Sequence, residues 1–179
     1  RFITTWPPHG NGLPVTEPRA RLLPWLSIAG LVLVADQLSK WVVVQNMYLG
    51  ERVDVFSFFG WVRWHNDGAA FSMLSGAGGR WFFVALAAGF GAFIIYELRR
   101  LPVNGRLMGW AYALILGGAL GNGVDRLAHG YVVDFVLVHY QDWYFPAFNV
   151  ADASLSAGAA CWLWVLLQEY LQQRRARAA

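Results

Sequence analysis

Four apolar segments, each long enough to cross a membrane, constrain this chain more than any other feature. They cover about residues 22–48, 81–98, 107–124 and 155–171. Each approaches the ~20 apolar residues that a helix needs to cross ~30 Å of hydrocarbon. A composition of 57% hydrophobic and 14% charged residues is typical of a chain that lies largely in lipid. The sequence therefore predicts an integral membrane protein with four transmembrane helices.

Arginine residues indicate the orientation of these spans. They precede the first span, fill the short connection between the second and third, and follow the fourth: Arg19, Arg21, Arg99, Arg100, Arg106, Arg174, Arg175 and Arg177. With an even number of spans, all three groups lie on one side, which the positive-inside rule makes cytoplasmic. Both termini are then cytoplasmic, and the longer connections at residues 49–80 and 126–154 face the opposite compartment.

Both longer connections contain strand patterns. Residues 53–64 are rich in Val, Phe and Trp with partial alternation, and residues 131–138 read similarly. The expected fold class is a mainly α membrane protein, a four-helix bundle with a small β-sheet lying on the membrane. One domain covers residues 21–174, with 175–179 as a cytoplasmic tail. Residues 1–20, rich in proline and glycine, are expected to be a disordered leader.

Polar residues from separate segments converge on the side of the membrane opposite the arginines. They are Asp36 and Lys40 in the first span, Asn122, Asp125 and Arg126 at the end of the third helix, Asp134 in the second long connection, and Asn149 and Asp152 before the fourth span. Ionisable residues in or near hydrocarbon are costly, so their default interpretation is functional. Asp36 and Lys40 are four residues apart and can pair on one helix face.

Two neighbouring carboxylates can activate water for hydrolysis. They cannot both ionise comfortably and so share one proton. The ionised member takes a proton from water while the protonated member polarises the scissile carbonyl. Asp134 and Asp152 are the candidate pair, and Asp125 remains open as a rival to Asp134 because it is another acid in the same outer segment.

Five short strings occur in order along the chain. They are Asp36-Gln37-Leu38-Ser39-Lys40, Asn66-Asp67-Gly68-Ala69-Ala70-Phe71, Gly121-Asn122-Gly123-Val124-Asp125-Arg126, Val132-Val133-Asp134-Phe135 and Phe148-Asn149-Val150-Ala151-Asp152. In sequence, order and spacing they resemble the signature motifs of the bacterial lipoprotein signal peptidases, the type II signal peptidases. The resemblance extends over about residues 22–171.

That resemblance implies an aspartyl endopeptidase of the bacterial inner membrane, with its active site near the periplasmic face. Such an enzyme removes the signal peptide of prolipoproteins just before the diacylglyceryl-modified cysteine. The resemblance implies no metal or organic cofactor, sensitivity to the cyclic peptide globomycin, and a lipidated prolipoprotein and membrane lipids as partners of a monomer.

Carried over by position, the resemblance assigns catalysis to Asp134 and Asp152. The remaining matching positions are supporting or substrate-binding residues: Asp36, Lys40, Asn66, Gly68, Asn122, Asp125, Arg126, Asn149 and Ala151. If Asp134 is catalytic, Asp125 and Arg126 are expected to form an ion pair that fixes the end of the third helix.

Alternative interpretations stay open at this stage. Asn149 can act simply as a helix N-cap, and Asp36 with Lys40 can be only a structural ion pair. The glycines at positions 117, 118, 121 and 123 favour helix packing over ligand binding. A serine peptidase would need Lys40 as its base, and a proton-relaying transporter is the non-enzymatic alternative. The histidines lack the spacing of a zinc protease.

Overall fold

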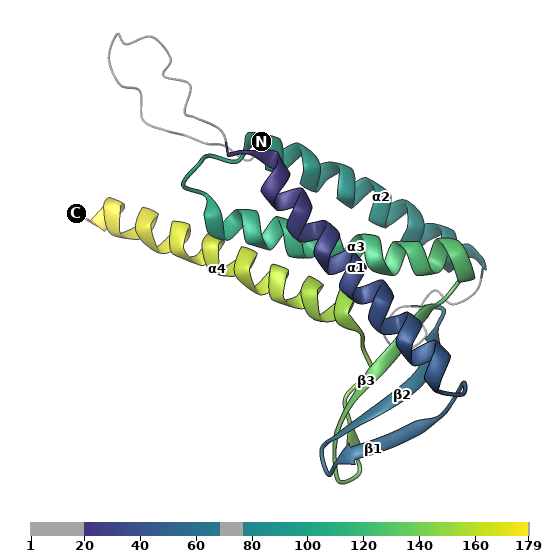
Figure 1. The fold of residues 1–179 in the computed structure, drawn as a ribbon. Coiled ribbons are helices and arrows are strands. Elements are labelled where there is room, and N and C mark those ends of the chain that lie inside the picture. The colour runs from purple at the N-terminus through teal and green to yellow at the C-terminus, as the bar shows by residue number, and fades with distance from the viewer. Residues whose placement is uncertain (1–19, 69–76, 179) are drawn as a thin grey trace.

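The computed structural model of the chain describes residues 20–68 and 77–178 (Figure 1). Its elements are α1 (Leu22–Asn46), β1 (Arg52–Phe56), β2 (Phe59–Asn66), α2 (Ala77–Arg100), α3 (Arg106–His129), β3 (Val132–Tyr140), β4 (Trp143–Tyr144) and α4 (Val150–Ala178). The predicted fold class, a mainly helical membrane protein with a small sheet, is confirmed. Except for Ala20, the expected leader lies outside the described residues, as do motif residues 69–71.

All four helices are long and apolar enough to cross a membrane. Their outward faces carry large apolar side chains, such as Leu31, Trp41 and Trp164, which are 69%, 60% and 54% exposed. Contiguous exposed apolar surface of this kind suits contact with lipid rather than with water. The helices therefore bury little of their apolar surface against one another and offer the rest to the bilayer.

Helix α3 is the centre of the bundle. It packs against α1, α2 and α4, whereas α2 and α4 hardly touch each other within the described residues. In the most apolar 18-residue stretch of each helix, 50% of α3 is buried, compared with 11–17% of the other helices. The buried apolar cluster lies where α1, α2 and α3 meet, and includes Ala29, Ile94, Leu98, Ile115 and Leu116.

Glycines allow these helices to approach closely. A Cβ atom added at Gly117 would lie 2.6 Å from Cβ of Val32 on α1, and one at Gly118 would lie 2.5 Å from the carbonyl oxygen of Ala151 on α4. A Cβ at Gly158 would lie 2.8 Å from the carbonyl oxygen of Ala111 on α3. The helix-packing interpretation of the α3 glycines is confirmed at these contacts.

The four strands form one antiparallel sheet in the order β1-β2-β3-β4. The sheet projects from the end of the bundle at which α1 ends and α4 begins (Figure 1). We call this the sheet end, and the opposite end, where α1 begins and α4 finishes, the terminus end. Arg63 of β2 ties the sheet to α1, because its guanidinium donates to the carbonyls of Val44 at 3.2 Å and Met47 at 2.7 Å.

Strand β3 links the bundle to the site. Helix α3 ends at Gly130, whose positive φ of 88° favours glycine and turns the chain into β3. β3 is the most buried strand and pairs with β2, placing Asp134 opposite Trp64. The chain then returns to start α4 at Val150, so that Asp152 lies in the first helical turn.

Candidate functional site

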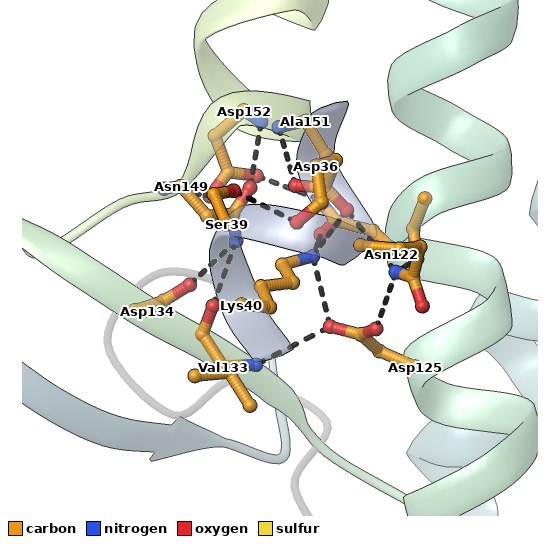
Figure 2. A network of polar contacts seen from close by, with 12 residues as sticks. Asp36, Ser39, Lys40, Asn122, Asp125, Val133, Asp134, Asn149, Ala151 and Asp152 are labelled. Carbon is orange, nitrogen blue, oxygen red and sulfur yellow. Dashed lines mark hydrogen bonds and ion pairs between the residues drawn. The ribbon is translucent and has the colours of Figure 1, made fainter. Parts of the chain in front are cut away.

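The polar residues that the sequence singled out meet at the sheet end. They come from α1, α3, β3 and the start of α4, and their side chains point toward one another (Figure 2). Most are buried: Asp36 and Asn149 are 0% exposed, Lys40 is 3% exposed, and Asp125 and Asp134 are each 4% exposed. Buried charge is tolerated only where it is paired and hydrogen-bonded. Their partners therefore decide what each residue can do.

Lys40 is fully engaged. Its ammonium donates to Asp36 at 2.7 Å and to Asn122 at 3.1 Å, and pairs with Asp125 at 2.8 Å. An ammonium has three N–H donors, so no proton is left for another partner. The predicted Asp36–Lys40 pair is confirmed. Lys40 is thus bound by two carboxylates and an amide oxygen, and it is not free to act as the base of a serine–lysine peptidase.

Asp125 also has a structural role, because its carboxylate links α3 to α1 and β3. Its carboxylate accepts hydrogen bonds from the Gln37 amide at 2.7 Å and from the Val133 backbone at 3.4 Å, in addition to pairing with Lys40. The expected ion pair between Asp125 and Arg126 is wrong for the described residues. Adjacent residues on a helix point about 100° apart, and Asp125 faces α1 instead.

Arg126 takes a different set of contacts. It donates to the carbonyl oxygen of Gly68 at 2.9 Å and to that of Asn122 at 3.4 Å, and its guanidinium lies 4.6 Å from the ring centroid of Phe83. Arg126 thus fixes the backbone at Gly68, two residues after the end of β2.

The start of α4 is capped by the site residues themselves. The Asn149 side chain accepts from the Asp152 backbone at 2.9 Å, and the Asp152 carboxylate accepts from the Asn149 backbone at 3.3 Å. This reciprocal pattern is that of a capping box. Asp36 accepts from the Ala151 backbone at 2.8 Å. The N-cap interpretation of Asn149 is confirmed, and α4 is also attached to α1.

Asn149 also joins the two candidate acids. Its side-chain amide donates to Asp134 at 2.8 Å, while its backbone N–H donates to Asp152. Each acid receives one further amide: Asp134 from Asn66 at 3.0 Å, and Asp152 from Asn122 at 2.7 Å. The carbonyl oxygen of that Asn122 amide accepts from Lys40, which fixes its orientation. Both carboxylates are therefore held in place by neutral amides.

The surroundings of Asp134 oppose its ionisation. Burial, and after it the nearby charge of Asp152, raise its pKa, while hydrogen bonds from Asn66 and Asn149 and the charge of Lys40 lower it, and the net result is a pKa of about 6. An ordinary Asp has a pKa near 4. The upward shift near a second carboxylate is what a pair that retains one proton requires.

Asp152 lines two cavities, each of about 450 Å³. The first lies between α2, α3 and α4 and is polar where Asn66, Asn122, Arg126 and Asp152 line it and apolar elsewhere. The second lies between Asn66, the start of α4 and residues 145–148. Asp134 lines neither cavity, but Asn66, to which it is hydrogen-bonded, lines both. We call the first one the sheet-end cavity.

The structure thus gathers at one end of the bundle the site residues that the resemblance assigned, all of which lie within residues 20–68 and 77–178. Those on or beside the hydrogen-bond network are Asp36, Lys40, Asn66, Gly68, Asn122, Asp125, Arg126, Asp134, Asn149, Ala151 and Asp152. Sequence reasoning missed Gln37, whose amide donates to Asp36, Asp125 and the carbonyl oxygen of Gly121. The available signal was a polar residue in an apolar helix, directly beside Asp36.

Comparisons with known proteins show which family resembles this chain. Residues 28–168 match the family model described as signal peptidase (SPase) II. The chain is 48% identical to the lipoprotein signal peptidase of Shewanella woodyi over 140 residues, which is 77% of this chain and 80% of that protein. It is 41% identical to the lipoprotein signal peptidase of Acinetobacter baylyi over 159 residues, which is 88% of each.

Two solved structures have the same fold. They are described as bacterial membrane enzymes determined by the in meso method at 2.3 Å and 1.9 Å resolution. Both superpose with a TM-score of 0.74 and cover 86% of this chain, at 28% and 30% sequence identity. The superpositions include 93% and 97% of those two chains.

Proposed function

Because this chain belongs to the signal peptidase II family and is a membrane peptidase, we propose that it removes the signal peptide from diacylglyceryl-modified prolipoproteins. Cleavage occurs just before the lipidated cysteine, with Asp134 and Asp152 activating water. The observation that carries this proposal is that Asn149 hydrogen-bonds both acids at the edge of a cavity that opens between apolar helices.

The chemistry follows from one proton shared by the two acids. The ionised carboxylate removes a proton from water as the water oxygen attacks the scissile carbonyl carbon, and the protonated carboxyl donates its proton to the carbonyl oxygen. The resulting tetrahedral diol then loses one hydroxyl proton to a carboxylate, the amide nitrogen gains a proton, and the C–N bond breaks. The raised pKa of Asp134 supports retention of the shared proton near neutral pH.

Asn66 provides the route from substrate to Asp134. It lines the sheet-end cavity and donates to Asp134, so a substrate carbonyl that replaces Asp134 as acceptor releases that carboxyl for catalysis. Asn122 continues to orient Asp152 because Lys40 holds its other end. Neutral amides suit this task since they add no charge beside the pair.

Membrane orientation completes the proposal. By the positive-inside rule, the arginines at the terminus end favour a cytoplasmic location for that end and a periplasmic location for the sheet end, in the bacterial inner membrane. A signal peptide enters sideways from the bilayer, since the cavity lies between α2 and α4, which hardly touch. The acyl chains of the modified cysteine remain in lipid, and the acids meet the chain at the interface.

The first prediction is that Asp134→Asn and Asp152→Asn each lower cleavage of a synthetic diacylated prolipoprotein peptide by at least about 10³-fold. Removing one member of a pair that acts as a unit abolishes most of its contribution. The measurement is single-turnover cleavage by purified enzyme in detergent, followed by mass spectrometry.

Asp142→Asn is the matched control, because Asp142 is exposed in the turn between β3 and β4. It should cleave at the parent rate. Turnover within tenfold of the parent by either of the first two variants would remove that residue from the pair.

A further inference from the structure

A third cavity lies at the terminus end of the bundle. It has a volume of about 580 Å³ and is formed by the end of α2, the connection to α3, and facing residues of α3 and α4. Its polar side chains are Glu97, Arg100, Asn104, Tyr112, Gln168 and Glu169. The reaction at the sheet end uses none of them. We call it the terminus-end cavity.

The sheet-end and terminus-end cavities are lined by nearly the same faces of α2 and α4. Leu86 on α2 and Leu155 on α4 line the sheet-end cavity, and Arg100 and Glu169, each 14 residues further along, line the terminus-end cavity. Fourteen residues are close to four turns of helix, so each pair lies on nearly the same face. Because α2 and α4 both pack on α3 and hardly touch each other, the two cavities lie along one path between α2 and α4.

The terminus-end cavity is suited to a cation. Glu97 and Glu169 form no ion pair within 4.0 Å among the described residues, although arginines are numerous at this end. Among those residues, Arg100 is the only cation that lines the cavity. It donates a hydrogen bond to the Tyr96 hydroxyl one turn away, and its Cζ lies 5.1 Å from the centroid of the Tyr96 ring. The nearest carboxylates are therefore left unpaired.

Tyr112 provides a second and independent indication of a ligand. The residue is only 8% exposed and lines the cavity, and its hydroxyl has no hydrogen-bond partner among residues 20–68 and 77–178. Like Glu97 and Glu169, Tyr112 lines the cavity. Its oxygen is not enclosed by protein, so it is open to a ligand there. An ammonium or guanidinium group bound here would supply a donor to the Tyr112 oxygen and to both carboxylates.

Distance connects this cavity with the substrate. Fourteen helical residues span about 21 Å at 1.5 Å per residue. The apolar region of a secretory signal peptide has about 7–15 residues and follows a positively charged N-terminal region. In a helix that region covers about 10–22 Å. An apolar region of about 11–14 helical residues, ~17–21 Å long, therefore extends from the level of Leu86 and Leu155 to that of Glu97 and Glu169.

We propose that the terminus-end cavity binds a lysine or arginine side chain from the N-terminal region of the signal peptide, with Glu97 and Glu169 as its counter-charges. This inference rests on the proposed function. It assigns this end of the enzyme a role in selecting substrates by charge and by the length of their apolar region.

The test compares two diacylated prolipoprotein peptides that differ only in their N-terminal region, with lysines in one and glutamines in the other. For the parent enzyme, KM for the lysine peptide should be lower by roughly three- to tenfold, as for a partly exposed ion pair of about 1 kcal/mol. In the double variant Glu97→Gln, Glu169→Gln this ratio should fall to about 1. Glu51→Gln at the sheet end is the matched control and should keep the parent ratio.

Two further arms keep the result interpretable. Tyr112→Phe preserves the ring and should lower the KM ratio in part. Lengthening the apolar region by four residues, about 6 Å of helix, should also remove the preference for lysine. A ratio near 1 in the parent, or an unchanged ratio in the double variant, overturns the inference while leaving cleavage intact. Absence of cleavage of both peptides by the parent contradicts the proposed function instead.

Discussion

At the scale of single residues, Asp134 has competing neighbours. Burial and the charge of Asp152 favour its neutral form, whereas Asn66 and Asn149 donate to its oxygens and favour the ionised form. The pKa of about 6 in the folded protein lies above the value near 4 of an unfolded chain. The folded state therefore holds this proton to higher pH than the unfolded state does.

A pH dependence of stability follows from that difference. The contribution of Asp134 to stability is greatest below about pH 4, declines as pH rises from about 4 to 6, and is level above that. The decline amounts to about 3 kcal/mol at most, from a shift of roughly two units. Asp134→Asn cannot ionise, so the thermal midpoint of the parent in detergent should fall relative to that of this variant as pH rises over that range.

Asp142→Asn serves as the control, since an exposed carboxylate is expected to leave the parent profile unchanged. A parent and an Asp134→Asn variant whose thermal midpoints run parallel from pH 4 to 7 would show that Asp134 ionises like an ordinary carboxylate.

Asp36 illustrates the difference between a buried and an exposed ion pair. Asp36→Asn leaves Lys40 with Asp125 but removes one of its two charged partners and weakens the contact with the Ala151 backbone. The expected cost is about 3 kcal/mol, at the low end for a broken buried pair. Thermal unfolding of the detergent-solubilised protein measures it, alongside the cleavage rate of the remaining folded enzyme.

The exposed pair of Asp54 with Arg52 is the matched comparison, because Asp54 is 53% exposed. Asp54→Asn should leave the thermal midpoint nearly unchanged. Equal losses in the two variants, or a loss of cleavage in Asp36→Asn without any loss of stability, would contradict the supporting role given to Asp36.

At the scale of elements, close contact between α3 and α4 determines where Asp152 sits. Gly118 faces the first turn of α4, and Gly158 faces α3 further along, with Ile115 and Ala111 near its Cα. In lipid, helices associate through such close packing because there is no hydrophobic force between them. A side chain at either position would separate α4 from α3 and move Asp152 away from Asn122.

Gly158→Ala should therefore lower the thermal midpoint and the cleavage rate together, at a cost of several kcal/mol, since the added Cβ meets backbone atoms at 2.8 and 3.1 Å. Gly30→Ala on α1 is the control, because a Cβ there meets nothing within 4 Å. Alanine should stabilise that helix by up to about 1 kcal/mol. The same loss at both positions would show that helix flexibility, rather than packing, explains the glycines.

At the scale of the whole molecule, the sequence predicts the general arrangement well. The apolar segments predict the four helices, and alternating apolar residues predict the strands of the sheet. The convergence of acids and amides at one end follows from their places at helix ends. These are properties of length, period and position, which the chain carries locally.

Other features depend on contacts between distant segments and were not predictable. The pairing of Asp125 with Lys40 and Gln37, in place of Arg126, depends on how α1 faces α3. The bond from Arg63 to the end of α1 depends on where the sheet rests. The helices also extend past their apolar windows, because capping by Asn149 starts α4 at Val150 and Gly130 ends α3 only after His129.

In the proposed reaction, Asp134 and Asp152 act together on one scissile bond. The most direct measurement is a crystal structure with a diacylated peptide whose scissile amide is replaced by a hydroxyethylene group, since such groups imitate the tetrahedral intermediate. We expect this hydroxyl to lie within hydrogen-bond distance of both carboxylates, and Asn66 to be hydrogen-bonded to the peptide backbone. A hydroxyl bound by Asp152 with Asp125, or by neither acid, would contradict it.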